Sequence, residues 1–451
     1  MTATTARPAA PPTAPAPTVQ VSAPVALTTA VLGAIAVALL WWHDTTGLHG
    51  LGDWLTNAGR ITGLFAGYAV LLVLVLMARV PALDRGIGSD RLARWHAMLG
   101  RYVVSLAVAH TLLIIWGYAV SAHTGVVSQT STLLMSYPDV LMATVALGLL
   151  VLVGVTSARA ARRRMSYESW HFVHLYTYLA IALSFSHQFA TGADFHDRGT
   201  RVLWAAMYVL VAAALLWYRV VVPIASAARH RMRVAAVVPE GRDVVSVYVT
   251  GRNLLRLGAQ PGQFFKWRFL TRTGWWAANP YSLSAAPTSD TLRITVKTAG
   301  QHSADLRRLR PGTRVFAEGP YGGFIAARRR RRKVLLIGAG VGITPVRALF
   351  GSVPARHGDL TLLYRARTPN DLVLRRELEE IAALRGASLH YLIGDRRTQR
   401  LDAARLRRLV PDVAEHDVFL CGPDAMTAEL RTELRRAGVP RSHIHAESFA
   451  L

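Results

Sequence analysis

The sequence is short of the residues that build covalent and metal–sulfur cores. Its 451 residues include a single cysteine, Cys421. One cysteine excludes an intramolecular disulfide framework, a cysteine-ligated iron–sulfur cluster and a zinc site made of several cysteines. Haem remains possible, because histidine can hold it and the chain has 16 histidines.

Lysine and acidic residues are also scarce. The chain has 27 acidic residues against 52 basic ones, and lysine occurs only at Lys266, Lys297 and Lys333. A net charge of +25 can indicate nucleic-acid binding. The arginines, however, flank apolar runs instead of interleaving with aromatic residues. We therefore expect no nucleic-acid partner, and we expect attraction to the anionic cytoplasmic leaflet of a membrane.

Residues 1–22 lack the apolar content needed for a core. They are rich in alanine, proline and threonine, which predicts a disordered tail. They also lack the basic start and apolar stretch of a signal peptide.

Long hydrophobic runs are abundant in the first half of the chain. Each approaches the roughly 20 residues that cross a bilayer as a helix. They predict a six-helix transmembrane bundle over residues 23–223. The runs lie near residues 24–42, 61–80, 97–120, 140–157, 172–189 and 202–222.

Arginine placement predicts the topology of this bundle. The connections at 79–101 and 158–169 and the segment after the sixth run are rich in arginine, whereas 43–59 and 121–139 contain no lysine or arginine. By the positive-inside rule, the basic connections face the cytoplasm. The sequence thus predicts a multi-pass protein of the cell membrane, with the lipid bilayer as a partner and both termini cytoplasmic. It leaves the oligomeric state open.

The second half has the patterns of a globular protein. Alternation with period two over 244–250 and 291–297 predicts a small antiparallel β-barrel over 230–327. From Lys333 strands and helices alternate, which predicts an α/β parallel-sheet nucleotide-binding domain over 328–451. The basic run Arg328–Lys333 is interpreted as a solvated linker or a membrane-facing patch.

Histidines inside the predicted spans need a functional reason, because ionisable groups in a bilayer are costly. His96 and His110 lie in the third run, about 21 Å apart along a helix and within roughly 40° of one face. His174 and His187 lie in the fifth, with a rise of about 20 Å but roughly 140° apart on an ideal helix. That helix would have to bend, bulge or present ligands from its edges. Two haems held between the runs, or isolated polar packing, remain the alternatives; His171 is a boundary residue or an alternative ligand.

The segments RWHAMLGRYVVSLAVAH and ESWHFVHLYTYLAIALSFSH resemble the third and fifth spans of the ferric reductase / NADPH oxidase superfamily. The cytoplasmic half looks like a ferredoxin–NADP reductase-type module, so that the resemblance covers about residues 24–451. It implies two b-type haems, the inner one between His96 and His174 and the outer one between His110 and His187.

The stretch Asn279–Ser284 resembles the flavin-binding strand of this family and implies an FAD site. Tyr281 would lie against the isoalloxazine or ribityl chain, and Ser282 near the reactive N5 edge. Asn279 stands where the reductases usually have arginine, which puts a charged contact to the pyrophosphate from this position in doubt. The implied FAD contacts are Gln263, Asn279, Tyr281, Ser282, Leu283, Ser284, Gly300 and Ser303.

A glycine-rich turn follows an apolar strand and opens a helix. Glycines there allow a tight turn and bring a pyrophosphate close to the helix N-terminus. The implied nucleotide contacts are Gly338, Gly340, Gly342, Thr344 and Pro345.

The later segment Cys421-Gly422-Pro423 resembles the nicotinamide site of the reductases. Cys421 would lie beside the nicotinamide ring, and its alternative role is that of a small buried residue ending a strand. The C-terminal segment resembles the family's ending, in which Phe449 would stack on the flavin and Glu447 would lie near the hydride path. With Ser282, these residues form the predicted catalytic set.

Arginines at strand ends favour NADPH over NADH. Arginine pairs well with a 2′-phosphate, and no acidic residue ends the second strand. The arginines concerned are Arg365, Arg367, Arg396 and Arg397.

The resemblance implies transmembrane electron transfer from NAD(P)H through FAD and two haems to a small external acceptor. Oxygen and ferric chelates are both open. Ile114 stands where superoxide-forming relatives commonly have histidine, which weakens the oxidase interpretation. The predicted external loops offer polar residues that could attract a ferric complex: Asp44, His49, Asp53, Asp194, His196 and Asp197.

One other function remains as an alternative, and a further one is disfavoured. The bundle could be an anchor or a transport module, with the C-terminal half a membrane-anchored flavin reductase for a cytoplasmic partner. A ferredoxin-coupled oxygenase reductase would instead carry a cysteine-rich cluster domain, which one cysteine cannot build.

Overall fold

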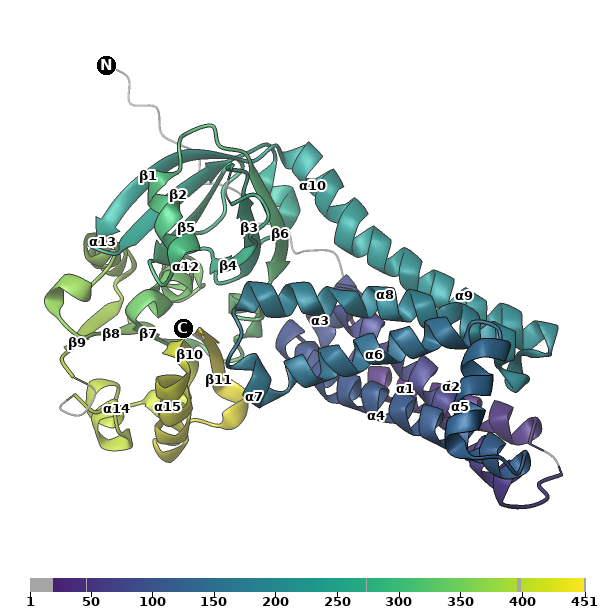
Figure 1. Ribbon diagram of the computed structural model, residues 1–451. Helices are drawn as coiled ribbons and strands as arrows, with labels where there is room; N and C mark the ends of the chain where they lie inside the picture. The colour runs from purple at the N-terminus through teal and green to yellow at the C-terminus, as the bar shows by residue number, and fades with distance from the viewer. Residues whose placement is uncertain (1–18, 46, 273, 396–398, 450–451) are drawn as a thin grey trace. The chain divides into compact units, whose positions relative to one another are not determined.

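A computed structural model describes residues 19–45, 47–272, 274–395 and 399–449. The chain divides into two compact units, residues 1–220 and 221–451 (Figure 1). The predicted tail lies almost wholly outside the described residues.

The first unit is helical. Ser166 and Asp197 cap its two later long helices by accepting the backbone N–H groups of Ser169 and Thr200. The elements are α1 (Ala23–His43), α2 (Leu51–Met77), α3 (Pro81–Gly86), α4 (Ser89–Ser121), α5 (Val126–Ser136), α6 (Val140–Ser157), α7 (Arg159–Arg162), α8 (Tyr167–Thr191), η1 (Ala193–Phe195) and α9 (Arg198–Leu216), after which the π-helical η2 (Trp217–Val221) runs into α10 (Val222–His230).

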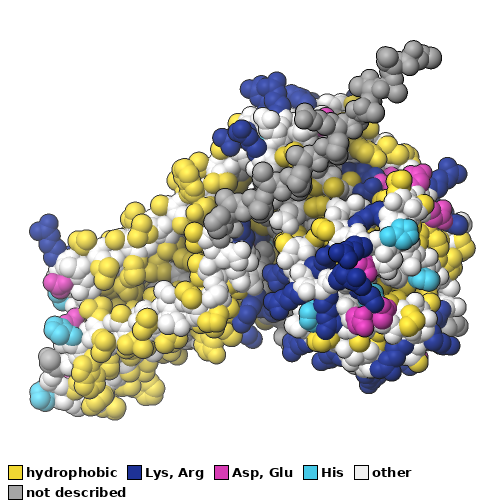
Figure 2. All heavy atoms as spheres, turned by 180° about the vertical axis from the view of Figure 1, so that it is seen from behind, with side chains coloured by type: hydrophobic (Ala, Val, Ile, Leu, Met, Phe, Trp, Pro, Cys, Tyr) yellow, Lys and Arg dark blue, Asp and Glu magenta, His cyan; other side chains and the backbone are white. Residues whose placement is uncertain are grey.

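Among the described residues, five helices are long and apolar enough to cross a membrane: Ala23–His43, Leu51–Met77, Arg91–Ser121, Val140–Ser157 and Arg198–His230. Their outer surfaces expose large apolar side chains such as Leu112, Leu141 and Leu210. In Figure 2, apolar side chains accordingly cover the helical unit along most of its length. The fifth predicted span coincides with α8, which has 25 residues but does not meet this hydropathy test. Its histidines and other polar residues lower its mean hydropathy.

Helices α2 and α4 pack closely along their length, as do α6 and α8. Small residues permit the first contact. A Cβ atom at Gly52 would meet the backbone of α4 near Gly117, and one at Gly117 would meet Thr56. Such small-residue contacts let membrane helices approach closely.

In the second unit, α10 is followed by two three-stranded antiparallel sheets, ordered β1-β2-β5 and β4-β3-β6. Their elements are β1 (Arg233–Gly241), β2 (Val244–Thr250), η3 (Leu254–Leu257), β3 (Phe264–Phe269), β4 (Asn279–Ser282), β5 (Thr291–Lys297), α11 (Gln301–Asp305), η4 (Leu306–Arg308), β6 (Val315–Tyr321) and η5 (Ala326–Arg328).

These sheets differ from the predicted closed barrel. The antiparallel pairing is as expected, but only the isolated bridges Arg233–Arg314 and Leu283–Ile294 connect the two sheets within the described residues. The sheets share one apolar core around Phe265, Trp267 and Ile294. Packing of this shared core therefore holds the two sheets together where strand pairing does not.

A five-stranded parallel sheet follows, ordered β11-β10-β7-β8-β9. Leu336 and Leu362 face one core with α12 and α13, whereas Leu335 and Leu363 face the other with α14 and α15. The predicted alternation of strands and helices is thus confirmed. The elements are β7 (Lys333–Ala339), η6 (Gly340–Gly342), α12 (Ile343–Ser352), β8 (Leu360–Ala366), η7 (Pro369–Asp371), α13 (Arg375–Arg385), β9 (Ser388–Ile393), α14 (Ala403–Leu409), η8 (Val413–Glu415), β10 (His416–Pro423), α15 (Asp424–Arg436), η9 (Arg441–His443) and β11 (Ile444–Phe449).

The strand order reverses between β7 and β10. From β7 the chain moves to β8 and β9 on one side, and it then returns to place β10 and β11 on the other. In open α/β sheets, ligands bind at the carboxyl ends of the strands at such a switch point.

Candidate functional site

The structure brings the four predicted haem ligands together in two pairs. The ring centroids of His96 and His174 are 5.9 Å apart, and those of His110 and His187 are 6.3 Å apart. Helix α8 runs unbroken through both of its histidines. The two pairs therefore join α4 and α8 at two levels of the bundle.

Hydrogen bonds orient three of these rings. Nδ1 of His110 donates to the carbonyl oxygen of Gly59 at 2.8 Å, and Nδ1 of His96 lies 3.3 Å from the carbonyl oxygen of Val73. Nδ1 of His187 lies 3.0 Å from the hydroxyl of Thr191, which itself donates to the His187 carbonyl. A proton on Nδ1 leaves Nε2 as the free lone pair, the arrangement that metal-binding histidines use.

His174 and His171 have different surroundings. The His174 ring faces His96 and stacks on Trp170, with centroids 5.1 Å apart. Among the described residues its Nδ1 is buried without a hydrogen-bond partner. His171 is exposed. The geometry thus selects His174, rather than His171, as the partner of His96.

A glycine on α2 makes room for the second pair. A Cβ atom at Gly63 would lie 2.6 Å from Nδ1 of His110. Because that distance is too short for any side chain, the ring position of His110 depends on this glycine.

The paired rings fit an iron atom between them. Metal–imidazole bonds of about 2 Å on opposite sides of a metal separate the two ring centroids by roughly 6 Å. The observed separations of 5.9 and 6.3 Å agree with this value. The described residues contain no group of three or more His, Cys, Asp or Glu that could hold a metal ion.

One predicted external acidic residue has a structural partner. Asp194 is buried and accepts hydrogen bonds from Arg60 at 2.5 and 3.3 Å. Arg60 also donates to Asn57. Asp194 is therefore neutralised within the helical unit and does not present a free charge to a ferric complex, contrary to its expected role. Arg60 was not among the predicted functional residues.

The predicted flavin strand is β4, which pairs with β3. Tyr281 lies beside Phe265 in register, and burial raises the pKa of Tyr281 to about 12. Ser282 is buried, and within the described part of the chain its Oγ has no hydrogen-bond partner. A buried hydroxyl without a partner is costly unless a ligand satisfies it, which fits a flavin edge at this position.

Other predicted flavin contacts are engaged within the protein. Leu283 is fully buried in the core of the two sheets. Ser284 Oγ accepts from Arg293 Nε at 3.0 Å and from the Thr295 hydroxyl at 2.8 Å. Both ends of the Gln263 amide are bonded to backbone, at Gly322 and Gln260.

The predicted second phosphate element is a compact turn. Ser303 Oγ accepts the backbone N–H groups of Ala299 and Gly300 at 2.8 and 3.0 Å and donates to the Gly300 carbonyl. Asn279 is half-buried at the start of β4.

The glycine-rich turn lies at the switch point of the parallel sheet. Gly340 has φ +54°, which favours glycine, and a Cβ atom at Gly342 would lie 2.4 Å from the Cys421 carbonyl oxygen. The turn therefore approaches the end of β10 as closely as backbone permits. Thr344 and Pro345 are buried in the first turn of α12, and the Thr344 hydroxyl bonds to Val341.

Cys421 occupies the centre of this edge. It is fully buried, with Gly338 beside it on β7 and Glu447 beside it on β11, and Gly422 and Pro423 complete β10. Burial, aided by Glu447, raises the pKa of the Cys421 thiol, so that it stays protonated at neutral pH. A side chain at Gly322 of the β-sheet part would come within 3.5 Å of Glu447 Oε1. Glu447 thus lies where the two parts of the second unit meet.

The remaining predicted residues are only partly described. Phe449 ends β11 beside Pro423. Arg365 and Arg367 lie at the carboxyl end of β8, on the nucleotide edge of the sheet. Arg396 and Arg397 lie outside the described residues.

A polar cluster that the sequence did not reveal joins the strands behind this edge. The buried carboxylate of Asp417 accepts the backbone N–H groups of Arg330 and Arg331, and it lies 3.0 Å from His443 Nδ1 and 3.2 Å from His445 Nε2. Burial opposes its ionisation, but these hydrogen bonds outweigh burial and hold the pKa of Asp417 below its usual range. The cluster thereby fixes the start of β7, β10 and the C-terminal strand to one another.

Two family models match the chain. Residues 62–185 match the ferric reductase like transmembrane component, and residues 336–432 match the oxidoreductase NAD-binding domain. The first range contains three of the paired histidines, His96, His110 and His174, and ends two residues before His187. The second range contains the glycine-rich turn and Cys421.

Curated relatives match about half of the chain. The glycine betaine monooxygenase reductase subunit of Chromohalobacter salexigens is 31% identical over 238 residues, which cover 49% of this chain and 64% of the relative. The ferredoxin reductase component of 3-ketosteroid-9-alpha-monooxygenase from Mycolicibacterium smegmatis is 35% identical over 233 residues, covering 48% and 65%. The match spans less than two thirds of each of these relatives.

A solved structure, the flavohem-like FAD/NAD binding domain of nitric oxide dioxygenase from Vibrio cholerae, aligns with 24% identity and a TM-score of 0.41, covering 49% of this chain and 98% of that chain. The protein is a multi-pass membrane oxidoreductase with a reductase module. Its chain carries a ferric reductase-like transmembrane domain fused to an oxidoreductase NAD-binding domain, which is the domain combination of the ferric reductase / NADPH oxidase superfamily.

Proposed function

We propose that the protein transfers electrons from NADPH, through FAD and two b-type haems, to a one-electron acceptor across the cell membrane. The observation that carries this proposal is the pair of histidine–histidine separations, 5.9 and 6.3 Å, between α4 and α8. In this proposal α8 also crosses the membrane, as the fifth of six spans. The paired imidazoles supply the reason why so apolar a bundle retains so many ionisable residues.

The bundle residues hold and orient the haems. His96 and His174 would ligate the inner haem, and His110 and His187 the outer haem. Backbone carbonyls of Val73 and Gly59 on α2 fix two of these rings by accepting from Nδ1. Haems held by these histidines would supply one-electron redox chemistry within the bundle.

The second unit binds and aligns the nucleotide and the flavin. The turn at Gly340 and Gly342 admits a pyrophosphate to the start of α12, and Cys421 and Glu447 line the switch point beside it. Ser282 would donate its unpartnered hydroxyl to the flavin edge. When bound, FAD accepts the two electrons of a hydride and can release them one at a time. Haems held by two histidines carry single electrons across the apolar layer.

Paired arginines at the nucleotide edge favour NADPH. Arg365 and Arg367 lie at the carboxyl end of β8, where a 2′-phosphate of the adenosine would be recognised. The basic connections support a cytoplasmic location for the second unit, by the positive-inside rule. The acceptor would then be a ferric chelate or oxygen on the opposite side.

An absorption spectrum of the purified full-length protein tests haem binding. We expect low-spin haem at two per FAD, and we expect His110→Leu and His187→Leu each to remove one haem. The matched control is His171→Leu, because His171 is an exposed histidine on the same helix as His187. A flavin-only spectrum would sink the proposal, and so would equal haem loss in the control.

A second candidate function follows from the relatives, whose printed names describe reductase components of monooxygenases. The second unit would then reduce a soluble protein partner, and the bundle would serve as its anchor. Soluble cytochrome c, supplied on the same side as NADPH, tests this function. Equal rates of its reduction by the wild type and by His110→Leu and His187→Leu would favour it.

A further inference from the structure

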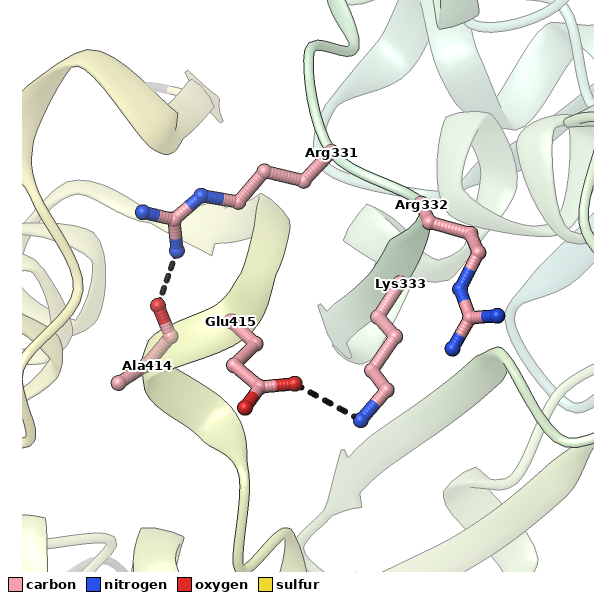
Figure 3. Close-up of a pocket in the computed structure, with 5 residues that line it drawn as sticks. All are labelled: Arg331, Arg332, Lys333, Ala414 and Glu415. Atoms are coloured by element: carbon pink, nitrogen blue, oxygen red, sulfur yellow. Dashed lines mark hydrogen bonds and ion pairs between the residues drawn. The ribbon is translucent and has the colours of Figure 1, made fainter.

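The basic run Arg328–Lys333, which the electron-transfer function does not use, divides between two neighbouring hollows of the second unit. Residues Arg331, Arg332 and Lys333 line the first with Ala414 and Glu415. Figure 3 shows Arg331 bonded to the Ala414 carbonyl and Lys333 to Glu415, and Lys333 also pairs with Asp412. These two cations are therefore satisfied within the protein.

The second hollow has a different balance of charge. It measures 560 Å³ and is lined by the end of α12 and its following loop together with four arginines, Arg329, Arg332, Arg356 and Arg385. No acidic side chain is among its lining residues in the described chain. Asp359 Oδ2 lies 3.4 Å from the Nε of Arg332, so that this one of the four lining arginines has a carboxylate partner.

Hydrogen bonds within the protein fix one of these arginines, but another keeps a nitrogen without a hydrogen-bond acceptor. Arg385 bonds to the carbonyl oxygens of Phe350 and Val353, which fixes its position at the end of α12. Nη1 of Arg329 is buried, and the described residues provide it with no hydrogen-bond partner. A buried guanidinium nitrogen without an acceptor is costly, and a bound anion would satisfy it.

The hollow lies away from the nucleotide site. Arg329 and Arg332 precede β7, the loop at 353–356 follows α12 and precedes β8, and Arg385 ends α13. All four arginines are thus at the amino edge of the parallel sheet. The glycine-rich turn and Cys421 are at its carboxyl edge, so that an anion bound here is not the dinucleotide of the reductase site.

We propose that this arginine hollow is a phosphate-binding site. Guanidinium forks match phosphate oxygens in paired hydrogen bonds, and several convergent arginines favour a phosphate over a single carboxylate. The phosphate belongs to an anionic phospholipid headgroup or to a soluble phosphate compound. The membrane spans tether the second unit to a bilayer and thereby give headgroups a high local concentration.

The experiment uses the full-length protein in lipid nanodiscs and measures hydrogen exchange of the backbone amides at 327–332 and 351–358. Discs of pure phosphatidylcholine are compared with discs containing phosphatidylglycerol, and pyrophosphate is added to the former as the soluble probe. Slower exchange with phosphatidylglycerol alone identifies a headgroup as the source. Slower exchange with pyrophosphate identifies a soluble phosphate.

The test variant is Arg329→Gln with Arg356→Gln, and its charge-matched control is Arg408→Gln with Arg431→Gln, exposed arginines on α14 and α15. Each arginine near an anionic surface contributes roughly fivefold to binding, so the test variant should weaken protection by roughly 25-fold and the control should not. If Arg329→Gln fails to fold, Arg356→Gln alone carries the test, because that side chain is exposed. Absence of protection by both probes, or equal loss in the control, overturns the site.

Discussion

At the residue scale, the smallest side chains determine where the histidines can lie. Gly63 has no functional group, yet a Cβ at this position would overlap the His110 ring, at 2.6 Å from Nδ1. Gly148 on α6 has nothing within 4 Å of the same virtual atom. The two glycines thus provide the same substitution with and without a steric consequence.

We expect Gly63→Ala to displace the His110 ring and to remove the outer haem while the inner haem stays bound. Gly148→Ala should leave both haems in place, because its methyl group enters open space. Haem content per flavin, measured by the pyridine haemochrome spectrum, reads both variants. Unchanged haem content in Gly63→Ala would contradict the assignment of His110 as a ligand.

Residue type and separation along the chain explain why the sequence predicted the histidines but not their surroundings. Residue type and depth identified the four imidazoles, because an intramembrane histidine needs a reason. The bond between Arg60 and Asp194 joins residues 134 positions apart, and spacing along a chain carries no information about such a pair. Arg293 was overlooked for the same reason, because β-strand alternation alone does not reveal which buried position holds a charge.

At the element scale, ideal helix geometry was a poor guide to α8. An ideal helix places His174 and His187 roughly 140° apart, which argued against a shared partner helix. The structure nevertheless brings each ring to within 6.3 Å of a ring on α4. A long side chain can reach across from the edge of a helix, so the angle between Cα positions does not fix where two rings meet. Helix α5 lies in the connection at 121–139, for which the sequence predicted no element.

A buried ion cluster joins the flavin strand to the nucleotide domain. Glu377 on α13 pairs with Arg347 on α12 and lies 3.1 Å from Arg293 on β5, and Arg293 donates to Ser284 beside the flavin strand. The side chains of Arg293, Arg347 and Glu377 are 7%, 14% and 27% exposed. Removing the carboxylate leaves two nearly buried cations unpaired.

We therefore expect Glu377→Gln to destabilise the second unit by about 3 kcal/mol, the usual cost of breaking a buried pair on one side. Hydrogen exchange of the β7 and β8 amides should accelerate by roughly 100-fold, since 1.4 kcal/mol corresponds to a factor of ten. Glu379→Gln, two residues along the same helix, breaks the exposed pair with Arg375 and should leave the exchange rate nearly unchanged. Equal effects of the two variants would contradict a structural role for the cluster.

The Asp417 cluster predicts acid sensitivity of the strands that it joins. Burial lowers the pKa of His445 even though Asp417 lies beside it, so folding disfavours its protonation. Stability from this histidine is complete above its unfolded pKa of about 6.5 and is lost as the pH falls below that value. The depressed pKa of Asp417 adds a second loss of stability below about pH 4.

We expect the unfolding midpoint of the second unit in guanidinium to decrease with pH in these two steps. Asp417→Asn should lower stability at neutral pH and flatten the lower step, because the variant cannot be protonated there. Asp243→Asn, an exposed carboxylate in the turn between β1 and β2, is the charge-matched control and should retain both steps. A wild-type midpoint that stays constant from pH 7 to pH 3 would contradict this account.

At the scale of the whole molecule, the chain separates two tasks between its two units. The helical unit carries the paired imidazoles and an apolar surface, and the second unit carries the switch point with Cys421 and Glu447. In the proposed function neither unit alone can oxidise NADPH on one side of a membrane and reduce an acceptor on the other. A measurement of the side of the membrane on which each reaction occurs therefore tests the whole chain.

We expect sealed vesicles with the second unit facing outward to reduce an enclosed, impermeant ferric chelate when NADPH is added outside. His187→Leu should abolish this reaction and keep reduction of the flavin by NADPH, because the substitution removes only one ligand of the outer pair. His171→Leu should keep both reactions.

Enclosed cytochrome c, assayed with and without superoxide dismutase, separates oxygen from the chelate as acceptor. Ile114 occupies the position one turn beyond His110, where superoxide-forming relatives commonly have histidine. We therefore expect the chelate to be reduced faster than superoxide forms. Reduction that occurs only outside the vesicles, and equally in His187→Leu, would leave the reductase module working without transmembrane transfer.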